Sequence, residues 1–445
     1  MHFKDQKISK GSSQIVVDET FSKDKFMIDN MHLNKAYTNF IHDKKISNLD
    51  EKRRILDSFK KRYHEYREFW HNVDKKITDK NLYNSLSKPH CIDIETASIC
   101  DLACPHCHRE YIVTPDKIMK EELYIKIIKE IKDLNIPSIK LNWRGEPLLN
   151  PLIDKFILLA KTHGVIDVSI NTNATTLDEK KGEKIINAGL DQIIFSFDGG
   201  TKETYEKMRP GRFQENHFET IYENIKNFCL LKRRMKKIFP ITKIQMVMTK
   251  SSRNEVKNFH KLFSDIIDYV VVTQYQERGG KMDDLSEDQK IKLSEYKNKS
   301  NNKDFKQYIA KANGDLLVSK DRKICDQLYQ RLMVTYDGRV GMCCHDWGAK
   351  HCLGYFDQDG INNYENDLKK ISDQVKANKK GFELLRNTKM PERYNEPDKK
   401  ISSLSEIWNG NELKKVRDNH ECGNIDSVEV CKNCSYKNSY NWEKI

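Results

Sequence analysis

From residue 92 to residue 273, short apolar runs alternate with longer stretches of helical periodicity, and this alternation constrains the fold more than any other feature of the chain. Six runs predict strands, at residues 92–96, 138–143, 167–171, 192–197, 244–248 and 269–273. The stretches between them predict helices at 120–134, 152–163, 179–188, 219–236 and 255–263. Consecutive βα units form a parallel sheet whose ligands collect at the C-terminal ends of the strands. The sequence therefore predicts an α/β fold with a curved parallel sheet or partial barrel.

The N-terminal region, residues 1–88, is dominated by charge and shows no series of strands. A helix predicted over residues 51–79 has an apolar side formed by Ile55, Phe59, Tyr63, Tyr66 and Phe69 or Trp70. We interpret the region as a helical extension that covers the barrel region, residues 89–278, in preference to a separate binding module.

The C-terminal part begins with residues 279–320, which are rich in Lys, Asn, Asp and Ser and predict a linker with one helix near 286–297. A second domain is expected over residues 321–445. It opens with a hairpin signal, because apolar runs flank an Asp337-Gly338 turn that supports positive φ angles. Residues 402–419 then predict a helix leading to Cys431 and Cys434.

The charge of the chain is +12, from 78 Lys and Arg against 66 Asp and Glu. The excess is spread along the whole sequence, without an RNA-binding signature or a basic helix interleaved with aromatic residues. The composition therefore argues against a nucleic-acid partner, and solvated lysine-rich faces account for the charge.

The apolar runs are far shorter than the roughly 18 residues that a membrane span requires, so no membrane partner is expected. Residues 1–10 lack the apolar core of a secretory signal, which makes the cytoplasm the expected compartment. In a chain without such a signal, twelve cysteines indicate metal or cluster ligands before disulfides.

Three of these cysteines, Cys100, Cys104 and Cys107, follow the first predicted strand, four and three residues apart. On a loop this spacing lets all three sulfurs face one centre and leaves one metal position open for chemistry. A zinc site completed by His106 or His108 is the alternative.

This arrangement resembles the radical S-adenosylmethionine (SAM) superfamily, whose hallmark is CxxxCxxC after the first strand of a partial (β/α)6 barrel. The resemblance implies that Cys100, Cys104 and Cys107 hold a [4Fe–4S] cluster whose open iron is chelated by SAM. One-electron cleavage of SAM then gives a 5′-deoxyadenosyl radical that abstracts hydrogen from substrate. The residue before the third cysteine, often aromatic in the family, is His106 here.

A turn after the second predicted strand strengthens this resemblance. Gly145, Glu146 and Pro147 resemble the family's GGEP turn, which presents backbone groups to the SAM amine, and Arg144 replaces the first glycine. Its position one βα unit after the cysteines favours SAM binding over an ordinary turn.

Polar residues also follow the third and fourth strands. Asn171, Asn173, Ser196 and Asp198 are suited to hydrogen bonds with the ribose and carboxylate of SAM, although helix capping or turn formation explains each equally well. Arg209 lies in an Arg-Pro-Gly segment that resembles one found in relatives with a C-terminal cluster domain, and it is expected either near the pocket or on a surface loop.

A second set of cysteines resembles the SPASM/Twitch domains of the same superfamily. Cys325, Gly338 and Cys343 match C-x9–15-G-x4-C, and Cys431 and Cys434 supply the later C-x2-C. The resemblance implies that the four cysteines ligate one auxiliary [4Fe–4S] cluster.

The rest of this domain indicates its type. Residues 404–409 read Leu-Ser-Glu-Ile-Trp-Asn, similar to the helix start of the family. A full SPASM domain requires further cysteines at two positions that Tyr440 and Lys444 occupy. The expected architecture is therefore a partial (β/α)6 radical SAM barrel with a helical N-terminal extension and a small C-terminal Twitch-like cluster domain.

Five cysteines remain: Cys91, Cys229, Cys344, Cys352 and Cys422. Most are expected to be buried small hydrophobes. The last three lie near cluster ligands in sequence, so one of them is a candidate substitute ligand or a hydrogen donor to a substrate radical.

These features together predict a radical SAM oxidoreductase that acts on a small polar substrate such as an amino sugar, aminocyclitol or polyol, with a flavodoxin or ferredoxin as electron donor. Oxidation is preferred over epimerisation, because no leftover cysteine is expected at the end of a barrel strand. The alternatives are an epimerase, a peptide or protein maturase, and a non-catalytic zinc or nucleic-acid-binding module.

Overall fold

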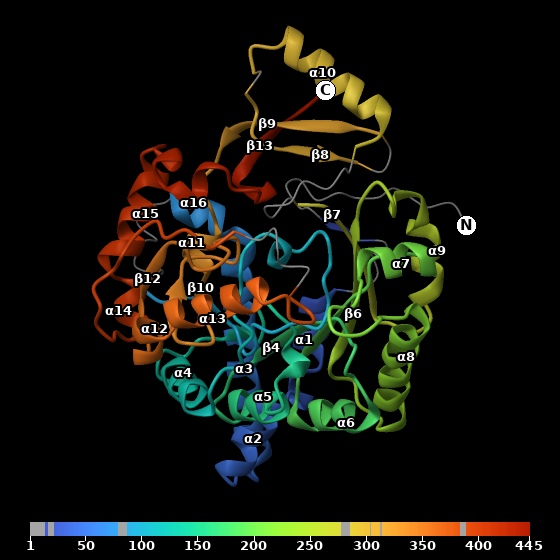
Figure 1. The fold of residues 1–445 in the computed structure, drawn as a ribbon. Coiled ribbons are helices and arrows are strands. Elements are labelled where there is room, and N and C mark those ends of the chain that lie inside the picture. Colours follow the sequence, from blue (N-terminus) through green and yellow to red (C-terminus); the bar gives the residue numbers. More distant parts are fainter. Residues whose placement is uncertain are drawn as a thin grey trace.

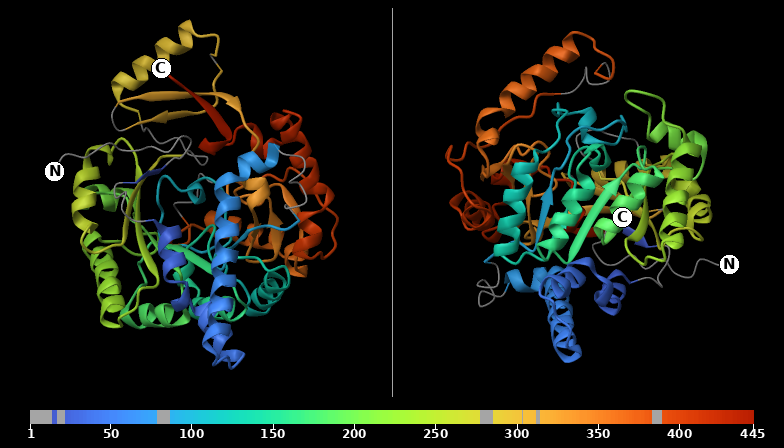
Figure 2. Two further views of the ribbon diagram at one scale, coloured as in Figure 1. Left: turned by 180° about the vertical axis from the view of Figure 1, so that it is seen from behind. Right: turned by 90° about the horizontal axis from the view of Figure 1, so that it is seen from below.

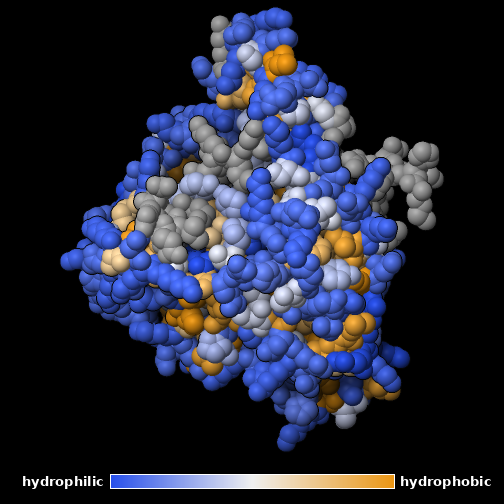
Figure 3. All heavy atoms as spheres, turned by 45° about the vertical axis from the view of Figure 1, so that its right-hand side comes forward, coloured by the Kyte–Doolittle hydropathy of each residue, from blue (hydrophilic) through white to orange (hydrophobic). Residues whose placement is uncertain are grey.

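The computed structural model describes residues 14–16, 22–78, 87–276, 285–302, 304–311, 314–382 and 389–445 (Figure 1). The segment 1–10, which we interpreted as lacking a secretory signal, lies outside the described residues. No described helix has the length and apolar character needed to cross a membrane. The face seen in Figure 3 is mainly hydrophilic, with hydrophobic residues in separate patches.

The core of the molecule is a ten-stranded sheet in the order β1-β7-β6-β5-β4-β3-β2-β10-β11-β12. Its six central strands are mutually parallel and confirm the predicted series: β2 (Cys91–Ile94), β3 (Ser138–Lys140), β4 (Asp167–Thr172), β5 (Gln192–Ser196), β6 (Ile241–Met248) and β7 (Tyr269–Gln274). A short strand, β1 (Gln14–Val16), adds antiparallel to β7. The partial (β/α)6 barrel is thus present.

The helices of the barrel cover the outside of the sheet (Figure 1). They are α4 (Glu121–Asp133), α5 (Ile153–Thr162), α6 (Glu179–Ala188), α7 (Lys202–Met208), α8 (Phe218–Arg234) and α9 (Val256–Phe263). Helix α6 shows how local sequence sets their ends. Its N-cap Asp178 accepts a hydrogen bond from the Lys181 amide, and Gly189 ends it at a φ of 91°, in the left-handed region.

The N-terminal extension contains α1 (Lys23–Asp29), α2 (Lys35–Asp43) and α3 (Leu49–Thr78). Figure 2 shows these blue helices along the back of the barrel and projecting below it. Their apolar side packs against Ile166 and Ile241, which lie at the N-terminal ends of the barrel strands. Lys23 forms an ion pair with Asp167 at 2.9 Å. The extension is therefore packed as a cover over the barrel end opposite the ligand-binding end.

The predicted hairpin forms between β10 (Arg331–Val334) and β11 (Arg339–Gly341), followed by β12 (Cys352–Tyr355). It does not belong to a separate sheet, however, because β10 pairs in parallel with β2 and continues the barrel sheet. A partial barrel leaves the edge of β2 open, and the buried residues Leu332, Met333 and Val334 suit a strand that closes such an edge. Sequence periodicity carries no information about this long-range pairing.

The segment expected as a linker differs from that expectation. Residues 285–322 contain α10 (Glu287–Lys299), β8 (Tyr308–Ala310) and β9 (Leu316–Arg322). With β13 (Tyr440–Lys444), the two strands form a small antiparallel sheet at the top of the molecule (Figure 1). Because one face of the sheet is polar, its composition resembles that of a loop, and its partner strand lies more than a hundred residues away.

The remaining helices surround β10–β12. They are α11 (Gln327–Gln330), α12 (Gln358–Asn362), α13 (Tyr364–Lys376), α14 (Leu404–Trp408), α15 (Asn411–Glu421) and α16 (Glu429–Lys432). The single helix expected over 402–419 is two helices, α14 and α15, separated at Asn409 and Gly410. A side chain at Gly410 would lie 2.8 Å from the Glu406 carbonyl oxygen.

The contact between the cover and the barrel gives a stability prediction. The fully buried Asn34 side chain donates hydrogen bonds to Asp191 Oδ1 at 2.7 Å and to the Ile166 carbonyl at 3.0 Å. Asn34→Ala removes both hydrogen bonds and leaves Asp191 Oδ1 without its donor, while the Ile166 carbonyl keeps only a long contact to Lys161 Nζ at 3.4 Å, and we expect the change to lower the free energy of unfolding by about 1–3 kcal/mol. Urea denaturation would show the loss. The same change at the exposed Asn187 is the control, and equal midpoints for the two variants would contradict this account.

Candidate functional site

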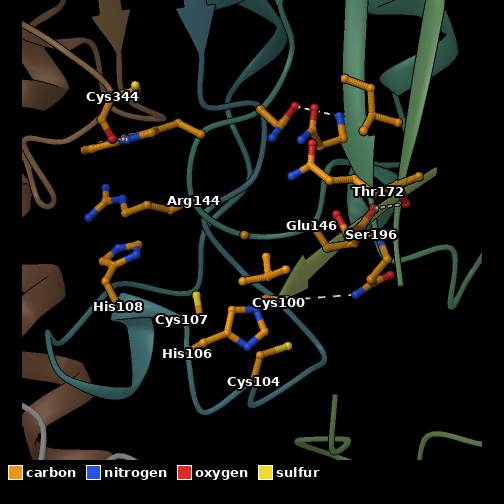
Figure 4. A pocket seen from close by; sticks show the side chains of 18 of the residues that line it. Cys100, Cys104, His106, Cys107, His108, Arg144, Glu146, Thr172, Ser196 and Cys344 are labelled. Atoms are coloured by element: carbon orange, nitrogen blue, oxygen red, sulfur yellow. Dashed lines mark hydrogen bonds between the residues drawn. The ribbon is translucent and has the colours of Figure 1, made fainter. Parts of the chain in front are cut away.

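A cavity of about 460 Å³ lies at the C-terminal ends of the barrel strands. Its lining includes nine of the residues singled out from sequence: Cys100, Cys104, Cys107, Gly145, Glu146, Asn171, Asn173, Ser196 and Arg209. His106, His108 and Arg144, which the sequence analysis also named, line it as well, whereas Pro147 and Asp198 are buried and do not. Figure 4 shows the three thiols around His106 at one end of the cavity, and Cys344 at the opposite end.

The cysteine loop after β2 is fixed by backbone hydrogen bonds. The Cys107 amide donates to the Cys104 carbonyl at 2.9 Å, and the Ala103 amide donates to the Pro210 carbonyl at 2.9 Å. Burial, followed by the charge of Asp101, raises the pKa of Cys100 to about 12. Thiols in such surroundings become stable thiolates when a bound metal supplies positive charge.

The turn containing Gly145 packs directly against the backbone that precedes Cys100. Gly145 has a φ of 74°, and a Cβ there would lie 2.5 Å from the Ala97 oxygen and 2.6 Å from the Ile99 oxygen. The Glu146 amide donates to the same Ile99 oxygen at 2.8 Å. Only glycine combines a positive φ with room for this close approach of the backbone, so Gly145 sets the position of the turn relative to the cysteine loop.

The Glu146 carboxylate joins that turn to the end of β4. It accepts hydrogen bonds from the Leu148 amide at 2.9 Å, Thr172 Oγ1 at 2.7 Å and the Asn173 amide at 2.7 Å. Burial raises its pKa to about 7, with Asp101 adding to the effect. The Glu146 carboxylate therefore holds the turn and the end of β4 together, and its oxygens accept hydrogen bonds mainly from the protein.

The two asparagines at the end of β4 have different surroundings. Asn173 Nδ2 donates to Asp101 Oδ1 at 2.8 Å and lies 4.0 Å from Cys100 Sγ, which ties it to the cysteine loop. Asn171 lines the cavity, and its buried Oδ1 has no hydrogen-bond partner among the described residues. This orphaned acceptor suits a bound ligand that carries a hydroxyl or amine donor.

Asp198, at the end of β5, anchors an ionic cluster beside the cavity. Its carboxylate lies 2.7 Å from Arg209 Nη2 and 3.3 Å from His106 Nε2, and it accepts from the Val247 amide at 2.6 Å. Burial alone would raise its pKa, but Arg209 and His106 outweigh burial and hold the pKa at about 2. Asp198 is a buried anchor, and Arg209 lies at the pocket and not on a surface loop.

One wall of the cavity was not found from sequence. His108 stacks on Trp347 at 3.7 Å between ring centroids, and Trp143 lies parallel to Trp347 at 5.8 Å. Trp143 Nε1 donates to the Cys344 carbonyl at 3.1 Å. Trp143 directly precedes the Arg144-Gly145 turn, and this position in the sequence could have indicated that it lies at the cavity. Trp347 comes from the loop after β11, and it could be placed at the cavity only once the pairing of β10 with β2 was known.

Arg144, which replaces the first glycine of the expected motif, has a structural partner. Its guanidinium forms two hydrogen bonds to the Glu95 carboxylate, at 2.6 and 2.9 Å, and both side chains are buried. This bidentate pair fixes the end of β2 to the turn after β3. The substitution is thus accommodated without loss of the turn.

The four cysteines of the second set line a separate pocket: Cys325, Cys343, Cys431 and Cys434. Burial, followed by Asp326 and the neighbouring thiols, raises the pKa of Cys325 well above its usual value. The Tyr436 amide donates to Cys434 Sγ at 3.4 Å, and His420 Nε2 lies 3.4 Å from Cys431 Sγ. Hydrogen bonds of this kind stabilise thiolate ligands of iron–sulfur clusters.

Both donor sets fit the clusters that the sequence resemblance implies, because each brings buried thiols to one pocket. Within the part of the chain that the structure describes, no three His, Cys, Asp or Glu side chains form a ligand set for a single metal ion.

The five leftover cysteines differ in their surroundings. Cys91, Cys229 and Cys352 are buried as expected, and Cys422 is exposed. Cys344 lines the first cavity, whereas the residue before it, Cys343, lines the second pocket. The sequence named Cys344 as one of three candidate hydrogen donors or substitute ligands, but it did not predict that the loop after β11 brings this cysteine to the barrel cavity.

Two family models match the chain. One, described as the Radical SAM superfamily, matches residues 94–263, and the other, the SPASM iron-sulfur cluster-binding domain, matches residues 325–435.

Similar curated proteins are named probable GTP 3′,8-cyclases. The protein of Methanothermobacter marburgensis is 34% identical over 112 residues, 25% of this chain and 36% of the relative. That of Pyrococcus horikoshii is 32% identical over 156 residues, 35% of this chain and 46% of the relative. The chain thus spans less than half the length of these relatives. A Saccharolobus islandicus protein is 25% identical over 264 residues, 57% of this chain and 82% of the relative.

Two solved structures are also similar. BtrN in complex with AdoMet and 2-DOIA has a TM-score of 0.42 and 16% identity, covering 78% of this chain and 92% of that one. Streptococcus suis SuiB bound to precursor peptide SuiA has a TM-score of 0.44 and 14% identity, covering 73% of each chain.

The close packing of Gly145 gives a prediction about the first cavity. In Gly145→Ala the added carbon must displace the backbone just before Cys100, so we expect at least tenfold weaker SAM binding and less iron per chain. Calorimetry with SAM and iron analysis would measure both. Gly314→Ala is the control, because that glycine has a φ of 88° but no atom within 4 Å of an added Cβ. Unchanged SAM affinity in Gly145→Ala would contradict the role assigned to the turn.

Proposed function

Because this chain belongs to the radical SAM superfamily and carries a SPASM domain, we propose that it oxidises a small polar substrate with SAM as the radical source. The observation that carries the proposal is the convergence of the cysteine loop, the Gly145 turn and the polar ends of β4 and β5 on one cavity. When bound, the cofactors supply a 5′-deoxyadenosyl radical in this cavity and an electron acceptor in the second pocket.

We assign the ligands of the SAM-binding cluster to Cys100, Cys104 and Cys107. The auxiliary cluster is assigned to the four cysteines of the second pocket, Cys325, Cys343, Cys431 and Cys434. For SAM itself, we assign Gly145 and Asn171 to direct contact, whereas Glu146, Pro147, Asn173 and Asp198 shape and order the site. Ser196 lines the same cavity and is a further candidate contact.

The polar lining of the cavity supports a small hydrophilic substrate such as a sugar, cyclitol or polyol. Gln245, Thr273 and Gln274 add amide and hydroxyl groups from β6 and β7. Such side chains match hydroxyl-bearing ligands by donating and accepting hydrogen bonds.

The connection between the two pockets supports oxidation. Cys343 and Cys344 are consecutive and line different pockets, and Cys344 Sγ donates to Gln327 Oε1 at 3.5 Å. Gln327 also lines the second pocket. Cys344 and Gln327 thus connect the lining of the cavity to that of the second pocket, which supports electron transfer from a substrate radical to the auxiliary site.

Epimerisation is the second candidate, and the position of Cys344 in the cavity favours it. A thiol there can donate a hydrogen atom to a substrate carbon radical, which returns the substrate to its original oxidation state and leaves a thiyl radical. One electron from the reductant and one proton from solvent then restore the thiol. The two candidates differ in whether the radical carbon loses a proton and an electron or gains a hydrogen atom.

The compartment and the reductant belong to the same proposal. Cluster ligands must remain reduced thiols, which favours the cytoplasm. Reductive cleavage of SAM also needs a one-electron donor, and a flavodoxin or ferredoxin has the required chemistry.

Iron content tests the cluster assignment. We expect about eight irons per chain in the anaerobically purified wild type, equal to two [4Fe–4S] clusters, and about four after Cys100, Cys104 and Cys107 are all replaced by Ala. This variant should also release no 5′-deoxyadenosine under reductant. Undiminished SAM cleavage would contradict the assignment, and about twelve irons in the wild type would reveal a third cluster.

Turnover of a candidate sugar in deuterium oxide tests the reaction type. Oxidation predicts a product about 2 Da lighter than the substrate, and Cys344→Ala should still form it. A product of unchanged oxidation state with one deuterium on carbon, lost in Cys344→Ala, would contradict oxidation and establish epimerisation.

A further inference from the structure

The cations that line the first cavity fall into two groups. Four of them are arginines, and each forms an ion pair with a carboxylate at an N···O distance of 2.6 to 2.9 Å. The pairs are Arg109 with Asp116, Arg144 with Glu95, Arg209 with Asp198, and Arg331 with Asp93. The other two are Lys140 and Lys243. Among the described residues, no carboxylate forms an ion pair with either lysine.

The two lysines come from different strands, β3 and β6, and both side chains face the same cavity. Lys243 is 7% exposed, and its Nζ lies 5.6 Å from the centre of the Tyr269 ring. Burial, followed by the charges of Lys140 and Lys23, lowers the pKa of Lys243 to about 8. Lys23 cannot neutralise this charge and is itself paired with Asp167.

Lys140 has similar surroundings. Burial lowers its pKa, and the attraction of Asp93, which opposes this effect, is shared with Arg331. Buried charges are costly unless an opposite charge compensates them. The protein thus keeps two poorly compensated ammonium groups at one cavity.

The depth of Lys243 separates it from the expected position of SAM. On β6, Lys243 lies four residues before Val247, which corresponds to about 13 Å along the strand at the usual rise per residue. The Val247 amide donates to Asp198, so Val247 marks the level of the strand ends. The SAM-binding turn and the cysteine loop lie at the level of the strand ends. An anion at Lys243 is therefore distinct from the carboxylate of SAM.

We propose that Lys140 and Lys243 bind an anionic group of the substrate, a carboxylate or a phosphate, at the floor of the cavity. This inference rests on the proposed function and narrows its substrate class. Hydroxyl-rich compounds that carry an acid or phosphate group fit the site, whereas compounds whose only charge is an amine are repelled by it.

Binding of simple anions tests the proposal directly. Inorganic phosphate and acetate are titrated separately by calorimetry into the holoenzyme saturated with SAM, so that the carboxylate of SAM is already seated. Each lysine contributes a charge-assisted hydrogen bond, so Lys140→Met and Lys243→Met are each expected to weaken binding of the preferred anion about tenfold or more. Lys243→Arg retains the charge and should retain binding. Lys180→Met, at an exposed position on α6, is the matched control and should bind like the wild type.

The anion that binds more tightly identifies the substrate group as phosphate or carboxylate. Absence of binding to the wild type, or equal affinity in the Lys140→Met Lys243→Met double variant, would overturn the proposal. Release of 5′-deoxyadenosine without substrate is measured in the same preparations and reports the proposed function independently. Lysine-dependent anion binding without SAM cleavage would contradict the radical function and leave the anion site standing.

Discussion

The parallel pairing of β10 with β2 is the contact on which the organisation of both sites depends. β2 leads into the cysteine loop, and β10 begins the hairpin that leads to Cys343 and Cys344. Joining these strands places the loop after β11 over the cavity, where Trp347 stacks on His108. Without this pairing the two groups of cysteines would belong to separate domains, and the first cavity would lack one wall.

Charge compensation explains how so polar a cavity is kept inside a folded chain. Buried carboxylates at the barrel ends are each held by a specific cation or amide donor, such as Glu95 by Arg144 and Asp198 by Arg209. At the opposite end, the N-terminal helices bring Lys23 to Asp167 and Asn34 to Asp191. These pairs fix the strand ends and orient the loops between them. The lysines at the cavity floor stand out because they lack such compensation.

The sequence predicted features that depend on local patterns. All six barrel strands and five of the six helices between them follow from periodicity, the exception being the short α7, and the spacing of the cysteines indicated both pockets. It did not predict features that depend on contacts between distant segments, such as β9 with β13, β10 with β2, or Trp347 in the cavity wall. The roles of Glu146 and Asp198 were also beyond local reasoning, because burial and partners decide whether a carboxylate faces a ligand or the protein.

The central claim is that two neighbouring pockets, joined at Cys343 and Cys344, each hold one iron–sulfur cluster. Anomalous diffraction from anaerobically grown crystals, recorded on either side of the iron absorption edge, tests it most directly. The account predicts two iron peaks per chain, one beside Cys100, Cys104 and Cys107 and the other among Cys325, Cys343, Cys431 and Cys434. A single iron peak, or a peak that appears only at the zinc edge, would contradict it.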